Sequence, residues 1–250
     1  MPKSMSYLVH LSRAPIVESV IYISVRFESA RDPKEFQSFG ELIEDYPNKQ
    51  ISQSFAVTIK AAPDAGQEVR TELGGYIFRS TDATRVVQSR PTGFSFSQLK
   101  PYESFEHTLN EAWRLWQIYR NRFHPDRITR LSVRYINRLE LPGPRLDFDD
   151  FLTTGPRLPK NVPEGLAAFS TSLVVPEVRP GVLAIIRQAF DSAMLTGDVV
   201  PVILDIDVLR ECDMGVNDAE AVHEALAQLR LAKNQLFFGS LTDRAVELFK

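Results

Sequence analysis

Segments in which apolar and polar side chains alternate recur through this 250-residue sequence, and they constrain the fold more than any other feature. Residues 133–141, VRYINRLEL, are the clearest example. In an extended chain, the apolar Val133 and Tyr135 would lie on one face and Arg134 and Arg138 on the other. This pattern predicts a strand with one buried and one charged face.

The same alternation predicts strands along both halves of the chain. They lie at 15–28, 54–61, 72–80, 84–91, 93–99, 127–141, 165–175, 181–190 and 199–211. Turn-forming stretches such as PDAGQ at 63–67 separate several of them. Short spacing between strands favours antiparallel pairing.

Helical spacing of apolar residues predicts two long amphipathic helices, at 101–123 and 218–238. A helix of about three turns is expected within 32–47, where Asp32 is a candidate N-cap and Pro47 a stop. Shorter helices are expected at 144–154 and, with Thr242 as N-cap, near the end of the chain.

We therefore expect an α+β protein, with antiparallel sheet and long helices packed on one face. The order of elements is similar in residues 1–124 and 125–250, and it predicts two pseudo-repeated β-α-β-β-β-α halves packed as one structural unit. The alternative is a single mixed sheet without internal symmetry.

Composition restricts the classes of function. The formal net charge of −3 gives the whole chain no general attraction to nucleic acid or to an anionic membrane, so only a local patch could provide one. The single cysteine, Cys212, excludes an internal disulfide. No apolar stretch has the length of a signal peptide or of a membrane span, so we expect a cytoplasmic protein without membrane contact.

Three stretches stand out along the chain: LSRAPIVESVIYISVRF near its start, RLSVRYINRLELP in the middle and NQLFFGSLTDRAVELF at its end. In this order and over this length, they resemble a sporadically distributed family of bacterial proteins of similar size. The resemblance implies a bacterial, cytoplasmic protein in an accessory-gene context, such as defence or toxin–antitoxin neighbourhoods. It implies no activity, cofactor or catalytic residue.

The arginines of the central strand are the first candidate binding site. Arg130, Arg134 and Arg138 share a face at intervals of four residues, or about 13 Å in an extended strand, and Arg127 lies just before them. Phosphates of a nucleic acid could be met at such spacing. The alternative is a charge ladder in which these arginines pair with carboxylates on neighbouring strands.

Two further positions are candidates for weaker reasons. Asp205 and Asp207 share a strand face and could hold Mg²⁺, but no phosphate-binding loop completes such a site. Pairing of these carboxylates with Arg187 or with the arginine strand is the alternative. Asn137 lies on the apolar face of its strand, where its amide would satisfy the backbone of a neighbouring loop or line a pocket between the sheet and the long helices.

The sequence contains no recognisable motif for a nucleophile, an acid–base pair, a metal cluster or a cofactor loop. It therefore favours a non-catalytic binding or regulatory protein acting through a protein partner. A nucleic-acid-binding module using the arginine face is the alternative, and a metal-dependent enzyme at Asp205 and Asp207 comes third. No cofactor is expected. The sequence leaves the oligomeric state open.

Overall fold

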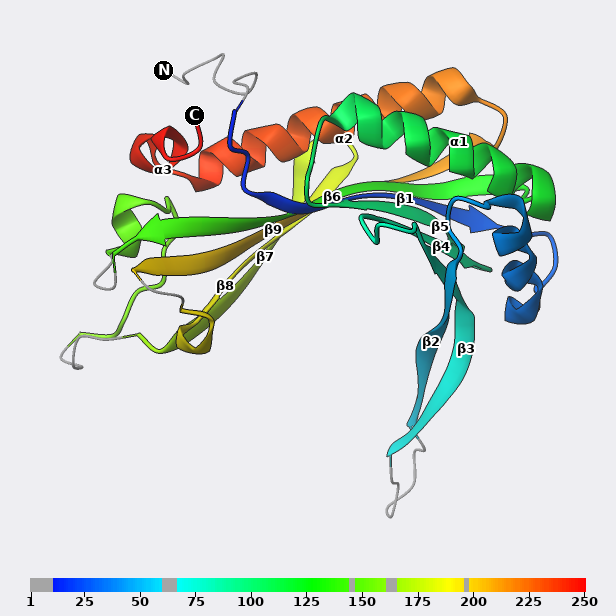
Figure 1. Cartoon of the computed structure of the whole chain (residues 1–250), viewed down its shortest axis with the longest axis horizontal. Coiled ribbons are helices and arrows are strands. Elements are labelled where there is room, and N and C mark those ends of the chain that lie inside the picture. Colours follow the sequence, from blue (N-terminus) through cyan, green and yellow to red (C-terminus); the bar gives the residue numbers. More distant parts are fainter. Residues whose placement is uncertain (1–10, 60–66, 144–146, 161–165, 196–197) are drawn as a thin grey trace.

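A computed structural model describes residues 11–59, 67–143, 147–160, 166–195 and 198–250 (Figure 1). The first ten residues of the chain and most of the turn expected at 63–67 lie outside the described residues. Within the described ranges, no helix is both long and apolar enough to cross a lipid bilayer.

Nine strands form one antiparallel sheet in the order β2-β3-β4-β5-β1-β6-β9-β8-β7. Their bounds are β1 Ile16–Arg26, β2 Asn48–Ile59, β3 Gln67–Arg79, β4 Arg85–Arg90, β5 Gly93–Leu99, β6 Arg127–Pro142, β7 Ala168–Arg179, β8 Val182–Asp191 and β9 Val199–Gly215. The expected α+β class with antiparallel pairing is confirmed. Several strands run further than the alternation indicated, with β2 beginning directly after Pro47.

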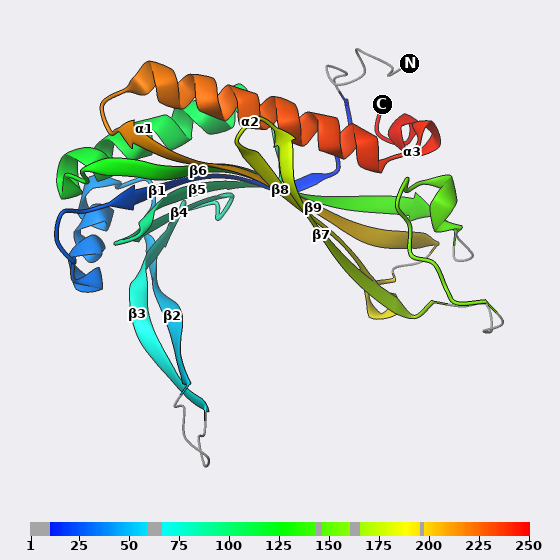
Figure 2. The same ribbon diagram turned by 180° about the vertical axis from the view of Figure 1, so that it is seen from behind.

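The helices are α1 Phe105–Phe123, α2 Ala219–Ser240 and the short α3 Asp243–Glu247. Figures 1 and 2 show α1 and α2 side by side along the same side of the sheet. Contacts join α1 to β1 and β5, and α2 to β6 and β9. Thr242 caps α3 as expected, because its hydroxyl accepts a hydrogen bond from the backbone N–H of Ala245.

The main core lies between the sheet and the two long helices. Strand residues of one parity are almost fully buried there, among them Ile21, Ile23, Val133, Leu204 and Ile206. Trp116 of α1 and Leu229 of α2 cover them. This burial explains the alternating pattern of the central strands, because only one of their faces is covered by helices.

The helix expected within 32–47 is present as the 3₁₀ helix η2 Pro33–Leu42. Its beginning is as predicted, since Asp32 caps it in a capping box with Glu35. Phe36 and Phe39 are three residues apart and stack on one side of a 3₁₀ helix. Both are buried against aromatic rings of α1.

A short helix was expected at 144–154. The described residues of this range form only the single 3₁₀ turn η3 Phe148–Asp150. Asp147 caps this turn through the backbone N–H of Asp149, and Leu152 then forms a bridge to Leu241. A third 3₁₀ turn, η4 Ser192–Met194, follows β8.

The sheet bends into an arch beneath the helices, and the β2–β3 hairpin descends from one end of it (Figure 1). A β-bulge interrupts this hairpin between Ser52 and Gln53, opposite Gly75. Gly75 has φ of +140°, and a Cβ placed there would lie 2.4 Å from the backbone oxygen of Ser89. Glycine therefore permits the bend. We call the helix-free side of the sheet the open face.

Candidate functional site

The arginines of β6 lie on the open face and pair with side chains of neighbouring strands. Arg134 donates from Nε and Nη2 to the two carboxylate oxygens of Asp205, at 2.8 and 2.7 Å. Arg187 of β8 reaches the same carboxylate, with Nη1 3.3 Å from Oδ2. Because Asp205 is 6% exposed and lies between two guanidinium groups, this triad is an internal ion-pair network. The hydrogen-bonded carboxylate raises the pKa of Arg134.

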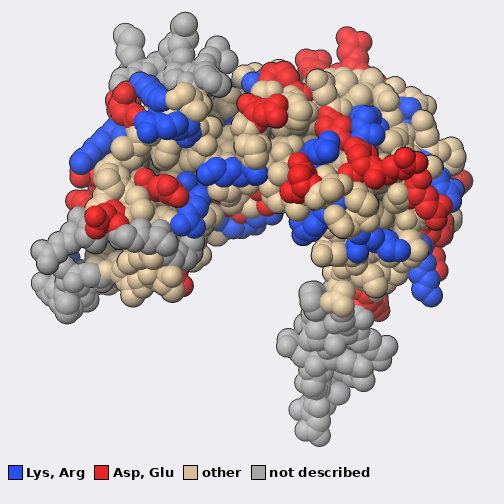
Figure 3. Space-filling view, viewed as in Figure 1, with Lys and Arg blue, Asp and Glu red and all other residues tan. Residues whose placement is uncertain are grey.

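The other candidate arginines are also engaged. The guanidinium of Arg130 lies 5.4 Å from the ring centroid of Tyr22. Arg138 approaches Glu140, with 3.5 Å between Nε and Oε1. Arg127 donates from Nε to the Asp213 carboxylate at 2.8 Å. Figure 3 shows Lys and Arg interspersed with Asp and Glu over the visible surface. A phosphate backbone at this strand would have to displace carboxylates already in place.

The strand register explains this arrangement. Arg134 is paired with Asp207 across β6 and β9, and Asp205 is paired with Arg187 across β9 and β8. Residues of one parity on neighbouring strands therefore bring opposite charges together. The cross-strand pairing considered for Asp205 is present.

The two aspartates considered for a metal are held by protein groups. Asp205 binds the two arginines, and Asp207 accepts a hydrogen bond from the hydroxyl of Ser132 at 2.5 Å. Among the residues that the structure describes, no group of three or more His, Cys, Asp or Glu side chains could hold a metal ion.

Asn137 lies on the helix-facing side of β6 and is 1% exposed. Its side-chain N–H groups donate to the backbone oxygen of Leu204 at 2.9 Å and to that of Tyr135 at 3.4 Å. The backbone groups it satisfies belong to strands β6 and β9 and not to a neighbouring loop, and it also lines a cavity.

That cavity, which we call the Lys233 cavity, has a volume of about 490 Å³. Its walls are the segment 11–16 at the beginning of β1, the segment 100–106 at the beginning of α1, Asn137 of β6 and the second half of α2. Such a volume is typical of a small-molecule site. Sequence reasoning missed this cavity, because its walls come from four parts of the chain far apart in sequence.

Lys233 is the unusual group in this cavity. It projects from α2, is 8% exposed, and its ammonium lies 3.7 Å from the ring centroid of Tyr135 on β6. Burial and, to a smaller extent, the positive charge of Arg230 together lower the pKa of Lys233 to about 7. No carboxylate of the described residues forms an ion pair with it. Buried lysines normally have such a partner.

A sequence signal for Lys233 existed. Buried positions of α2 include Val222, Leu226 and Leu229, and Lys233 continues the same series at helical spacing. A lysine on the apolar stripe of an amphipathic helix is expected to be buried. The helix at 218–238 was predicted from its apolar residues alone, without regard to the lysine among them.

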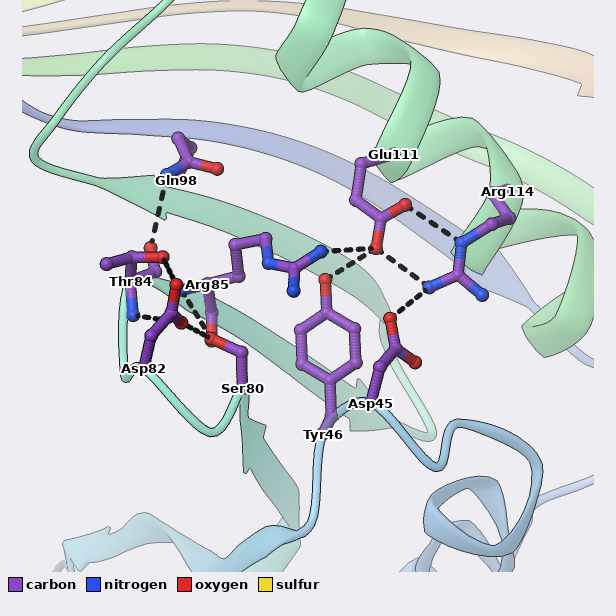
Figure 4. Close-up of polar contacts among 9 residues, drawn as sticks. All are labelled: Asp45, Tyr46, Ser80, Asp82, Thr84, Arg85, Gln98, Glu111 and Arg114. Atoms are coloured by element: carbon purple, nitrogen blue, oxygen red, sulfur yellow. Dashed lines mark hydrogen bonds and ion pairs between the residues drawn. The ribbon is translucent and has the colours of Figure 1, made fainter.

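A second polar cluster anchors α1, and we call it the Glu111 network (Figure 4). Glu111 accepts hydrogen bonds from the Tyr46 hydroxyl at 2.7 Å and from Nε and Nη2 of Arg114 at 2.8 Å. Arg85 of β4 lies 3.5 Å from it, and Arg114 also reaches Asp45 at 2.9 Å. Burial opposes ionisation of Glu111, but bonds from Arg114 and Tyr46 hold its pKa below the usual value. Each of these charges has a partner.

Comparisons with protein-family models, with curated proteins and with solved structures found no match to this chain.

Proposed function

We propose that this chain is a non-catalytic binding or regulatory protein that acts through a protein partner, and that an extended segment of the partner pairs with the outer edge of β7. The carrying observation is the exposed apolar edge of this strand. β7 is the last strand in the sheet order. Leu173 and Val174, adjacent in β7, are 47% and 62% exposed.

The composition of β7 supports pairing with another chain. Residues 168–175 carry no charged side chain, whereas protected sheet edges commonly carry lysine. β2, at the other end of the sheet order, has Lys49 beside its exposed Ile51. An added strand would gain backbone hydrogen bonds along β7 and apolar contact with Leu173 and Val174.

A hollow next to β7 supports the same proposal. A cavity of about 300 Å³ is lined by Leu173 of β7, Ile186 of β8 and Leu236 of α2, together with small residues at the end of α2. An apolar side chain from a strand paired with β7 would lie near this hollow. Specificity in strand addition usually comes from such side-chain pockets.

The nucleic-acid alternative receives less support from the open face. Arg134 and Arg187 share Asp205, and Arg127 is paired with Asp213, so the positive charge of this face is largely balanced within the chain. Binding through phosphates needs cations whose charge is available.

We further propose that the two halves arose by duplication. The first strand of each half, β1 and β6, forms the antiparallel centre of the sheet. The strand before each long helix, β5 or β9, pairs with the first strand of its own half, and each long helix contacts these two strands. This repeated arrangement supports the proposal. The accessory-gene context implied by the resemblance stays a prediction.

The test of the partner is affinity purification from the native host at low and high salt, using the full chain, Val174→Lys and the control Leu158→Lys. Leu158 is 46% exposed outside the sheet, so the control adds the same charge away from β7. We expect one stoichiometric protein at both salts with the wild type and the control, and its loss with Val174→Lys.

Nucleic acid that elutes as salt rises, retained equally by Val174→Lys, would instead favour the alternative function. Retention of the same protein by all three chains would contradict the β7 edge as its binding surface.

A further inference from the structure

We propose that the Lys233 cavity binds a small organic acid, whose carboxylate lies next to Lys233 and whose apolar body contacts the aromatic residues of the cavity wall. This inference is independent of the proposed partner at β7, which lies on a different part of the sheet.

The first step is that no carboxylate in the part of the chain that the structure describes is paired with Lys233. Its ammonium contacts the face of Tyr135, and a cation on an aromatic face gains only part of what an ion pair would provide in a site removed from water. The hydroxyl of Tyr135 is directed to Tyr102, with 2.9 Å between the two oxygens. Tyr135 therefore offers the lysine its ring and not a negative charge.

The second step is the sign of the surrounding charge. Among the described residues, the charged groups that line the cavity are four cations and two carboxylates: Arg13, Lys100, Arg230 and Lys233, and Glu103 and Glu106. One of the carboxylates, Glu106, is already paired with Arg230. Tyr135 beneath the lysine and Tyr102 in the cavity wall are neutral groups, because burial raises the pKa of both. The net charge of the wall favours an anion.

The third step is the apolar part of the wall. Phe105, Phe237 and Phe238 line the same cavity, at the start of α1 and near the end of α2. The Arg230 guanidinium is stacked over Phe105, 4.8 Å from its ring centroid. This wall combines apolar rings with charged groups, which suits an amphipathic small molecule. A carboxylic acid with an aryl or alkyl body matches this combination, whereas inorganic phosphate matches only the charge.

Binding of such an acid is coupled to protonation of Lys233. Because this amine titrates near pH 7 in the protein, a large share of it is neutral at physiological pH. A carboxylate beside it favours the ammonium form, so the complex takes up a proton and affinity decreases as the pH rises above 7. At most, the loss is tenfold for each pH unit.

The experiment is isothermal titration calorimetry of the full chain with octanoate and with benzoate at pH 6, 7 and 8. Each pH uses two buffers that differ in ionisation enthalpy, so that proton uptake is measured directly. The matched ligands are octanamide and benzamide, which keep the body and remove the charge. Inorganic phosphate tests for a simple anion site.

We expect at least one of the two carboxylates to bind at one site, more weakly at pH 8 than at pH 6, with roughly half a proton taken up at pH 7. The amides should bind at least tenfold more weakly. Lys233→Met should lose at least tenfold in carboxylate affinity and all of the proton uptake, whereas Lys49→Met, on β2 and remote from the cavity, should change neither.

Failure of both carboxylates to bind, equal binding of the amides, or binding by Lys233→Met with unchanged proton uptake would each overturn the proposal. Binding of phosphate in place of the carboxylates would overturn it as well. Should Lys233→Met not fold, the proton uptake of the wild type still decides the question, since binding without uptake at pH 7 and 8 contradicts a role for Lys233.

Discussion

The two long helices bury a charged side chain in opposite ways. Glu111 of α1 has the guanidinium groups of Arg114 and Arg85 and the hydroxyl of Tyr46 around it (Figure 4). Among the described residues, Lys233 of α2 has the face of Tyr135 and the repulsive charge of Arg230 around it, and no carboxylate is paired with it. Both helices cover the same sheet, so burial alone does not determine what a charged residue does.

The partners of each group determine whether its buried charge stabilises the folded protein, as for Glu111, or destabilises it, as for Lys233. Good hydrogen-bond partners compensate a buried charge for much of the hydration that it loses. Removing that charge leaves its partners buried without a counterion, which costs free energy. A buried charge without a counterion keeps the penalty and shifts its pKa toward the neutral form. In this protein the pKa of Glu111 lies below its usual value and so does that of Lys233. The first shift favours the charged form and the second disfavours it.

Among the variants that test this comparison, Glu111→Gln is expected to change the free energy of unfolding most. This change removes the negative charge that Arg114 and Arg85 share, and we expect the free energy of unfolding to fall by about 2 kcal/mol at pH 7. Urea denaturation followed by circular dichroism measures it. Both arginines are partly exposed, which keeps the estimate below that for a fully buried pair.

The pH dependence of the same variant sharpens the comparison. The folded pKa of Glu111 is lower than its ordinary value of 4.5, so the unfolded chain binds more protons in acid. Its stabilisation is therefore present above pH 4.5 and is lost as the pH falls through the folded pKa. A difference between wild type and Glu111→Gln that stays constant down to pH 3 would contradict this account.

A smaller effect on stability is expected from Tyr46→Phe. This change removes the hydroxyl that donates a hydrogen bond to Glu111 and leaves the buried ring in place. We expect a loss of about 1 kcal/mol in the free energy of unfolding. The double variant with Glu111→Gln provides the control, because the two losses should be less than additive if the hydroxyl acts through the carboxylate. Full additivity would show that the two groups act separately.

Alternation and turn residues predicted much of the fold, because they depend on local sequence. The strand at 133–141 lies within β6 at the centre of the sheet, and Thr242 caps the last helix. The segment after Asp32 forms a helix as predicted, but its 3₁₀ type could not be predicted, since Phe36 and Phe39 pack against rings distant in sequence.

Charge pairing between strands was harder to predict from the sequence than the strands themselves. Arg134 could be placed on a charged face, but its bond to Asp205 depends on the register of β6 against β9, which joins residues 71 positions apart. Register is a tertiary property. The Lys233 cavity depends on the meeting of four segments, and only the lysine on the apolar stripe of α2 indicated it.

The most direct test of the central claim is the titration of Lys233 in the intact protein. Protein labelled with ¹³C at the lysine ε-carbon is followed by NMR from pH 5 to pH 11, and Lys233→Met assigns the resonance. We predict one lysine with a pKa of about 7, absent from the variant. If every lysine titrates near the ordinary value of 10.5, then Lys233 has a counterion or is hydrated, and the contrast between the two helices is wrong.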